Sequence, residues 1–335
     1  MANRYESQRR RTAFWNVITH ILMLAGSVLM VAPFVWMFST SLKTEGNIFT
    51  PTPEWLPRQT FYFYQPAGGA KVKIEQPLVD NDHGRSQIRL PGAADLQWAP
   101  ASSVVRETRL APAWENYTEV IRSVPFFQGV RNTLFITLTA LIGGLFTTSL
   151  SAYAFAKLRF PGRDTLFFAL LGTMMIPGVV TMLPTFILFR QAGWINTFYP
   201  LIIPALFGGA WGIFLMRQHF KTIPDELEDA ARIDGCNPFM TYSRVVMPLS
   251  RPTLATLAIF GFMGGWNDFM GPLIYLNDPD KFTLQLLLAS FSSYYSTKTN
   301  LLMAGSVMSL IPVLILFFAA QRYFVQGITL TGMKG

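Results

Sequence analysis

The chain has 335 residues, of which 51% are apolar and only 14% are charged. Soluble globular domains carry about 25% charged residues, so this composition indicates a membrane protein. A net charge of +8 can accompany nucleic-acid binding, but Lys and Arg fall mostly between apolar runs, and we interpret the basicity as a topological signal. We therefore expect a lipid bilayer, and no nucleic acid, as a partner.

Six apolar runs are long enough to cross a bilayer, whose hydrocarbon core requires roughly 20 apolar residues in a helix. They cover approximately 17–38, 132–156, 165–189, 198–216, 252–276 and 301–324. The first run follows several arginines, as a signal peptide would, but it exceeds the roughly 7–15 residues of a signal core, so we expect an uncleaved anchor. The predicted fold class is an all-α polytopic membrane protein with six transmembrane helices.

The distribution of basic residues predicts the orientation. The short loops and ends on one side hold fourteen Lys and Arg, whereas the short loops on the other hold three. Because the basic side faces the cytoplasm, both termini are predicted to be cytoplasmic. The predicted parts are a cytoplasmic N-terminus (1–16), a first transmembrane helix (17–40), an extracytoplasmic insertion (41–127), a five-helix transmembrane core (128–325) with a cytoplasmic loop (217–251), and a cytoplasmic tail (326–335).

The insertion between the first two spans shows partial two-residue alternation of apolar and polar residues. The alternating stretches are 59–64, 71–79, 87–90 and 104–110, and glycine, proline and asparagine residues separate them. This pattern predicts a small β-rich subdomain, with a loosely ordered loop lying on the spans as the alternative. The single cysteine, Cys236, cannot form an intrachain disulfide, so packing alone must hold this part together.

Motifs for enzymatic chemistry are missing from the sequence. It contains no Gly-x-x-x-x-Gly-Lys-Ser/Thr loop, no His-Glu-x-x-His and no Gly-x-Ser-x-Gly, and its three histidines lie far apart. The chain is therefore not expected to be an enzyme or to bind ATP, a metal or another cofactor. The one clear acid at membrane depth is Asp268, beside Asn267 in the fifth apolar run, and both a structural and a functional role remain open for it.

The loop between the fourth and fifth spans predicts two short helices joined by a sharp bend. Pro224, followed by two acids, is typical of a helix start, and Gly235 is typical of a helix end. Asn237 and Pro238 then favour the start of a second helix, as its cap and its first position.

The first of these helices has a face suited to contact with another protein. Leu227, Ala230, Ala231 and Asp234 recur at three- and four-residue spacings, and the acids Glu226, Glu228 and Asp229 flank them. On the second helix, Phe239, Tyr242 and Val246 form an apolar stripe. We interpret the pair as a knob that fits a groove on a partner. Helices that lie on a bilayer, or that bind DNA, favour basic residues, and five acids lie between residues 225 and 234.

The same loop resembles the signature of the permease subunits of binding-protein-dependent ABC importers, which reads Glu-Ala-Ala, three residues, Gly, nine residues, Ile-x-Leu-Pro. Here it reads Asp229-Ala230-Ala231, then Gly235, then Val245-Val246-Met247-Pro248, with both spacings kept. The substitutions at 229, 245 and 247 preserve charge or apolar character. Segments at 114–118, 132–134, 266–269 and 321–335 are similar to the sugar-importing branch, and within it to the smaller permease of the maltose importer.

The resemblance covers the first span and the chain from about residue 112, whereas residues 50–112 depart from it. It implies the six-helix fold of type I ABC importers and a permease that moves a sugar into the cytoplasm across the bacterial inner membrane. The implied partners are a second, related permease, two ATPase subunits that carry ATP and Mg²⁺, and an extracytoplasmic sugar-binding protein. The implied ATPase-coupling residues are Glu226, Leu227, Glu228, Asp229, Ala230, Ala231, Asp234, Gly235, Phe239 and Pro248.

The pathway for the solute is less clear in the sequence. Trp266, Asn267, Asp268 and Phe269 are candidate pathway residues, because aromatic rings such as those of Trp266 and Phe269 stack on sugars. The equal alternative is that these two aromatic residues belong to an interface or to the core. Glycines and prolines in the third to fifth spans let helices bend and approach closely, either for packing or for gating. The alternative functions are an ion-coupled secondary transporter, a membrane-embedded enzyme, and an importer permease for a non-sugar solute.

Overall fold

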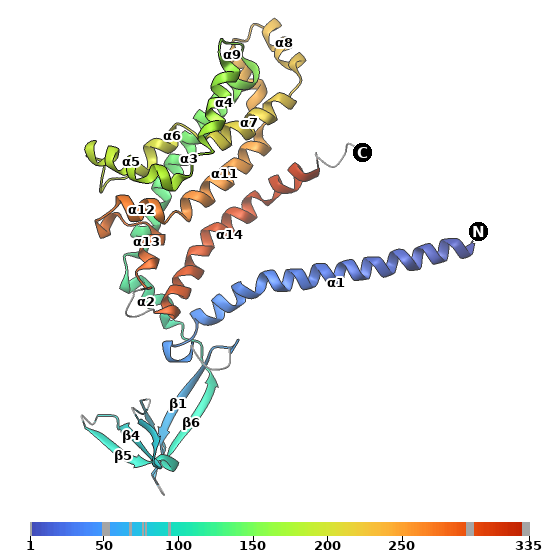
Figure 1. The fold of residues 1–335 in the computed structure, drawn as a ribbon. Helices are drawn as coiled ribbons and strands as arrows, with labels where there is room; N and C mark the ends of the chain where they lie inside the picture. Colours follow the sequence, from blue (N-terminus) through green and yellow to red (C-terminus); the bar gives the residue numbers. More distant parts are fainter. Residues whose placement is uncertain are drawn as a thin grey trace. The chain divides into compact units, whose positions relative to one another are not determined.

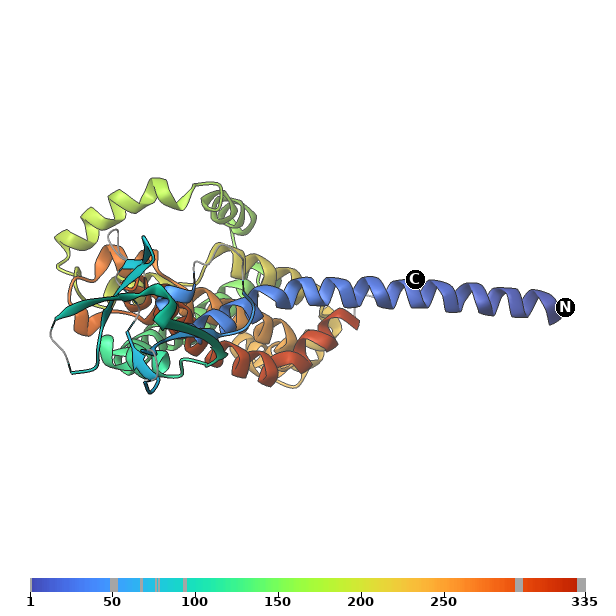
Figure 2. The ribbon, with the colours of Figure 1, turned by 90° about the horizontal axis from the view of Figure 1, so that it is seen from below.

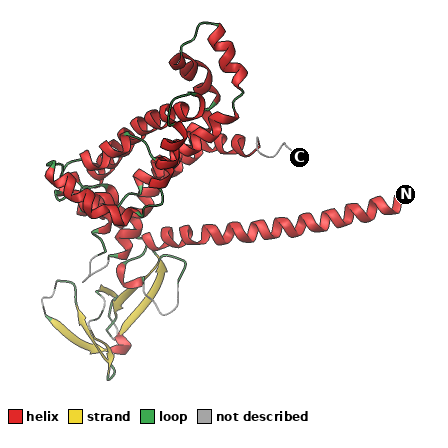
Figure 3. Ribbon diagram, turned by 45° about the horizontal axis from the view of Figure 1, so that its top comes forward, coloured by secondary structure: helices red, strands yellow, loops and turns green. Residues whose placement is uncertain are grey.

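The computed structural model describes residues 2–48, 54–66, 69–75, 77, 79–92, 95–292 and 298–329. The predicted tail therefore lies outside the described residues from 330 onward. The chain divides into two compact units, one of Met1–Val120 with Phe291–Met308 and one of Ile121–Ser290 with Ser309–Gly335. Figure 1 shows their elements, and Figure 3 shows that the strands are confined to one segment of a mainly helical chain.

The first unit contains the N-terminal helix and the insertion. Its elements are α1 (Ala2–Ser41), β1 (Arg58–Tyr64), β2 (Val72–Ile74), β3 (Val79–Asp82), β4 (Arg85–Arg89), β5 (Leu96–Pro100) and β6 (Val104–Leu110), with short 3₁₀ turns at Glu45–Asn47 and Ala101–Ser103. The strands form two antiparallel sheets, in the orders β2-β1-β6 and β3-β4-β5. The predicted β-rich insertion is thus confirmed, although β5 was not predicted and β3 runs through Asn81 and Asp82, which the sequence pattern indicates as a break. Ile74, Ile88 and Ala99 form the small core of the insertion.

Buried polar groups fix the point where the insertion joins α1. The Asn116 side chain donates to the Ser41 carbonyl at 2.8 Å and to the Lys43 carbonyl at 2.9 Å, and it accepts from Asn300 at 3.0 Å. The Lys43 ammonium lies 4.3 Å from the centroid of the Trp36 ring. Burial lowers the pKa of Lys43, and the charge of Glu54 opposes this shift. Because Asn116 ties the Ser41 and Lys43 carbonyls to Asn300, the end of α1 is held against the segments that contain Asn116 and Asn300.

The second unit is built around a long central helix, α3 (Phe126–Lys157). The other helices of this unit are α4 (Arg163–Thr173), α5 (Gly178–Gln191), α6 (Tyr199–Leu206), α7 (Ala210–Thr222), α8 (Asp225–Ile233), α9 (Pro238–Thr241), α10 (Met247–Leu249), α11 (Arg251–Trp266), α12 (Met270–Tyr275) and α13 (Leu284–Ala289). Two further helices, α2 (Glu115–Ser123) and α14 (Thr299–Thr329), contribute to both units. Helices α6, α7, α11 and α13 pack directly against α3.

Among the described residues, four helices are long and apolar enough to cross a membrane, and the total rises to six if each bent pair of helices is one span. The single spans are Phe14–Ser41, Phe126–Lys157, Tyr199–Phe220 and Thr299–Gln321. One bent pair is α4 with α5, which meet at 96° (Figure 2), and the other is Pro238–Leu249 with α11, at 79°. The prediction of a helical membrane protein with up to six spans is therefore supported. The third span is strongly bent, and in the second bent pair Pro238–Leu249 belongs to the predicted loop while α11 belongs to the predicted fifth span.

The boundaries of the predicted straight spans need correction. The third does not run unbroken from 165 to 189, because α4 ends at Thr173 and Pro177 precedes α5. Proline disfavours helical backbone in the residue before it, which explains the break. The fourth is interrupted between α6 and α7, where Gly208 has a φ of +76°. The fifth does not run helically to 276, because α11 ends at Trp266.

Glycines bring α3 close to its neighbours. A Cβ atom at Gly144 would lie 2.6 Å from the Ala205 carbonyl oxygen of α6, and one at Gly265 would lie 2.9 Å from the Thr137 side chain of α3. A Cβ at Gly264, by contrast, would meet nothing within 4 Å. The first two positions therefore support the packing interpretation of the glycines, since small residues permit close helix approach in membranes.

Candidate functional site

The predicted loop between the fourth and fifth spans forms an ordered structure that is attached to α3. The Lys157 ammonium, at the end of α3, lies 2.6 Å from the Asp225 carboxylate and 3.1 Å from the Glu228 carboxylate. It also donates to the Ile223 carbonyl at 2.8 Å. The side chains of Lys157 and Glu228 are 5% and 4% exposed, so this is a buried ion pair. One lysine thus fixes the first turn of α8 against α3.

The electrostatics of α8 also favour this arrangement. Three acids occupy its first turn, where they complement the positive end of the helix dipole, and Arg232 lies in its last turn. The hydrogen bond from Lys157 holds the pKa of Asp225 below its ordinary value. Asp225 therefore stabilises the fold at neutral pH, and this contribution disappears as the pH falls through the lowered pKa.

The bend after α8 is a Schellman motif centred on Gly235. The Cys236 amide donates to the Ala231 carbonyl at 2.9 Å, and the Gly235 amide donates to the Arg232 carbonyl at 3.0 Å. Gly235 has a φ of +83°, in the left-handed region that favours glycine. The sequence prediction of a helix end at this residue is confirmed.

The residues of the predicted α8 face divide between its two sides. Glu228 and Ala231 are buried, so they pack within this chain. The other predicted members of the α8 set lie at the surface, namely Glu226, Leu227, Asp229, Ala230, Asp234 and Gly235. Ile233, which sequence reasoning overlooked, is 87% exposed. The surface that remains open on α8 therefore combines acids with a few apolar side chains.

The predicted apolar stripe on the second helix needs correction. Asn237 caps α9 by accepting from the Met240 amide at 2.8 Å, as the sequence predicts. However, α9 has only four residues and continues as a π-helix over Tyr242–Val246. Tyr242 and Val246 are buried against α3 and α7, and the Tyr242 hydroxyl lies 2.8 Å from the Ser149 hydroxyl. Only Phe239 of the stripe is exposed.

The loop nevertheless presents an apolar surface, which we call the docking surface. It consists of Leu227, Ile233, Phe239 and Met240, all of which are exposed. Pro248, the last residue of the signature, is also exposed, within α10. Ile233 and Met240 were not predicted to belong to this surface. Both are apolar residues that lie outside the predicted helix faces, and that property could have identified them.

The four predicted pathway residues do not form one site. Trp266 is fully buried, its indole donates to the Ser309 carbonyl at 3.1 Å, and its ring stacks on Phe262 with centroids 5.7 Å apart. It is therefore a core residue of this chain. Asn267 donates to the Met263 carbonyl of its own helix at 2.9 Å, and Phe269 is exposed. Asp268 differs from the other three in lining a large cavity of the second unit.

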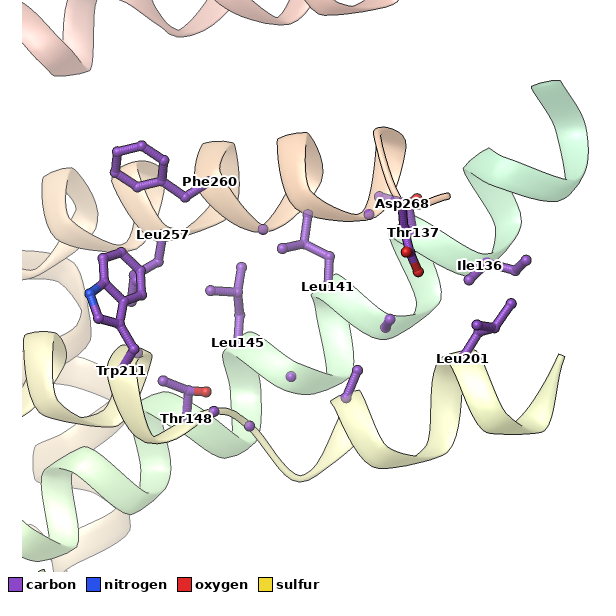
Figure 4. A pocket seen from close by; sticks show the side chains of 18 of the residues that line it. Ile136, Thr137, Leu141, Leu145, Thr148, Leu201, Trp211, Leu257, Phe260 and Asp268 are labelled. Atoms are coloured by element: carbon purple, nitrogen blue, oxygen red, sulfur yellow. The ribbon is translucent and has the colours of Figure 1, made fainter. Parts of the chain in front are cut away.

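This cavity is a groove of about 400 Å³ in the second unit, and Figure 4 shows its lining. Helices α3, α6, α7 and α11 form its walls. Six glycines are among its lining residues, four threonines supply hydroxyl groups, and Trp211 and Phe260 supply aromatic rings. Sequence reasoning missed these two aromatic residues, although Trp211 lies among glycines in the segment from Gly208 to Gly212. The groove has the size and mainly apolar lining of a small-molecule site.

The fold, the ordered loop of α8 and α9 and the groove define the chain as a helical membrane protein with a cavity of small-molecule size. The family model of the binding-protein-dependent transport system inner membrane component matches residues 98–330. The chain therefore belongs to this family.

Individual proteins agree with this assignment. The arabinooligosaccharides transport system permease protein AraQ of Halalkalibacterium halodurans is 38% identical over 204 residues, which cover 61% of this chain and 73% of the relative. The osmoprotective compounds uptake permease protein GgtD of Synechocystis is 26% identical over 339 residues, covering 99% and 97%. A chain of a bacterial ABC transporter that imports the acidic polysaccharide alginate has the same fold, with a TM-score of 0.67, 22% identity and coverage of 93% and 96%.

Proposed function

We propose that this chain is the permease subunit of an ATP-driven importer that moves a sugar into the cytoplasm. The observation that carries the proposal is the ordered loop of α8 and α9, which is attached to α3 and leaves the docking surface open. Membership of the family and the similarity to an arabinooligosaccharide permease support the same conclusion. A permease for another small solute is the second candidate, because GgtD is named for osmoprotective compounds.

In this proposal the chain works with other subunits. Two ATPases bind ATP and Mg²⁺, and one of them holds the docking surface in a groove, as helices with exposed apolar anchors commonly dock. The acids Glu226, Asp229 and Asp234 beside this surface favour a basic rim on that groove. A second permease completes the pathway, and an extracytoplasmic protein delivers the sugar.

Reconstitution of the complete complex in proteoliposomes tests the function. We expect ATP hydrolysis to rise when the sugar-loaded binding protein is added, and labelled sugar to enter the vesicles only in the presence of ATP. A complex without the ATPase subunits is the control, and it should take up nothing. The proposal would be contradicted if neither ATP hydrolysis nor sugar uptake changed when any sugar-loaded binding protein was added.

The proposed topology places residues 1–16, 217–251 and 326–335 in the cytoplasm and 41–127 outside. The single cysteine, Cys236, is partly exposed in the proposed cytoplasmic loop and is a native probe of this topology. We expect a membrane-impermeant maleimide to label it in inside-out vesicles but not in right-side-out cells. In a Cys236→Ser background, Ser102→Cys in the insertion should show the opposite pattern. Labelling of Cys236 from outside would reverse the proposed orientation.

A further inference from the structure

The groove contains two buried hydroxyl groups without a protein partner. Thr137 and Thr283 are 2% and 3% exposed, and both line the groove. Neither Oγ1 atom has a hydrogen-bond partner among the described residues. Buried polar groups in proteins are nearly always paired, so two unpaired hydroxyls in one groove indicate a place for a polar ligand.

Asp268 joins Thr137 at the same end of the groove, as Figure 4 shows. The Asp268 carboxylate accepts from the Gly271 amide at 3.1 Å and also from the Met270 amide, which fixes the side chain. A carboxylate has about four acceptor sites, so these two bonds leave acceptor capacity for a ligand. Gly265 provides the space for Thr137, because a Cβ at this glycine would lie 2.9 Å from the threonine hydroxyl. This end of the groove therefore offers hydrogen-bonding groups of both kinds.

The other end of the groove is aromatic. The rings of Trp211 and Phe260 meet edge to face, with centroids 5.8 Å apart, and they are 48% and 53% exposed. Thr148 lies near this end, in contact range of Gly208 and Gly212. Thr148 follows Thr137 by eleven positions of α3, which corresponds to about 16 Å along the helix. The groove is thus longer than a single sugar ring.

The charge of the lining narrows the class of ligand. Among the described residues that line the groove, Asp268 is the only acid, and none is Lys, Arg or His. A carboxylate or phosphate group would lose its hydration there without gaining a cation, and Asp268 would repel it. Neutral hydroxyl groups meet no such cost, because threonine and aspartate oxygens can pair with them.

We propose that this groove binds a neutral oligosaccharide during its passage through the membrane. The apolar faces of the sugar rings pack on Trp211 and Phe260, and hydroxyl groups near the other end pair with Thr137, Thr283 and Asp268. The inference rests on the proposed importer function, and it names both the class of sugar and a site for it in this chain.

Uptake by variant complexes tests the inference. Proteoliposomes with the complete complex are given labelled neutral arabinooligosaccharides or labelled diuronate, each with its loaded binding protein. Trp211→Leu should lower kcat/KM for neutral sugar about 3- to 10-fold, and Trp211→Phe should recover most of it. Thr137→Val, which removes only the hydroxyl, should lower it similarly. Phe168→Leu on exposed α4 and Thr181→Val on α5 are matched controls outside the groove, and we expect both to transport normally.

The outcomes separate this inference from the proposed function. If the unaltered complex takes up sugar and the groove variants match it, the site is wrong but the importer function stands. Uptake of diuronate as efficient as that of neutral sugar overturns the neutral class. If the unaltered complex takes up no saccharide, the proposed function itself fails. Thermal unfolding of each purified complex shows whether a variant fails because it loses its fold. If Thr137→Val is unstable, the comparison of Trp211→Leu with Trp211→Phe decides whether the groove binds sugar.

Discussion

Replacing Gly235 with valine is expected to lower the amount of sugar transported for each ATP hydrolysed. Gly235 has a φ of +83°, and a residue with a side chain pays about 1–2 kcal/mol to adopt this conformation, with β-branched residues the least tolerant. A Cβ at this position would meet nothing within 4 Å in this chain. The expected defect is therefore a changed bend between α8 and α9, which displaces Phe239 relative to Leu227 on the docking surface.

Two substitutions make this prediction specific. Gly235→Asn should retain most of the coupling, because asparagine tolerates the left-handed conformation better than other residues with side chains. Gly193→Val is the control for backbone strain alone, since Gly193 also has a positive φ (+72°) and open space at its Cβ position but lies outside the loop. Uptake and ATP hydrolysis would be measured at matched membrane abundance. If the Gly235→Val complex transported the normal amount of sugar for each ATP hydrolysed, the bend would not determine the coupling of transport to ATP hydrolysis.

Local signals in the sequence were sufficient for the features that depend on local chemistry. The apolar runs predicted the spans because a bilayer imposes a minimum length of apolar helix. The end of α8 at Gly235 and the cap of α9 at Asn237 were also predictable, since each depends on a few neighbouring residues. Alternation located β1, β2, β4 and β6 of the insertion but missed β5, which ends at Pro100, and most of β3, whose Asn81 and Asp82 are typical turn residues.

Features that depend on distant residues were not predictable in this way. An apolar stripe in a sequence does not show whether a partner protein or the same chain covers it. Tyr242 and Val246 pack on α3 and α7 of this chain. The sequence left a sugar contact and a core position equally open for Trp266, and its partners, Phe262 and the Ser309 carbonyl, make it a core residue. The groove is formed by α3, α6, α7 and α11, which are far apart in the sequence, so no single segment of the sequence predicts it.

The second large effect is expected from Lys157→Met, which removes the cation that attaches α8 to α3. Glu228 would then remain buried without its partner, and breaking a buried ion pair in this way typically costs about 3–5 kcal/mol. We expect α8 to detach from α3 while the spans remain in the membrane. Transport should fall strongly, and the loop should become sensitive to protease in inside-out vesicles.

A double substitution tests whether the unpaired buried charge of Glu228 is what detaches α8 in Lys157→Met. Lys157→Met combined with Glu228→Met leaves no unpaired buried charge, so it should recover much of the protease resistance lost in Lys157→Met. Arg159→Met removes an exposed cation two residues away and should leave the loop intact. If the double variant is as protease-sensitive as Lys157→Met, the pairing of these two charges is not what holds α8.

Transport by the same double variant shows how a movement of the loop is transmitted to the groove. Helix α3 carries Lys157 at one end and Thr137, Leu141 and Thr148 in the wall of the groove. A movement of α8 can reach the groove through α3 as long as the two helices move together, since packed elements shift as units. A methionine pair restores packing but not the directional ion pair. We therefore expect its transport per ATP to stay below that of the unaltered complex even where protease resistance returns, and full recovery of transport would show that apolar packing alone transmits the movement.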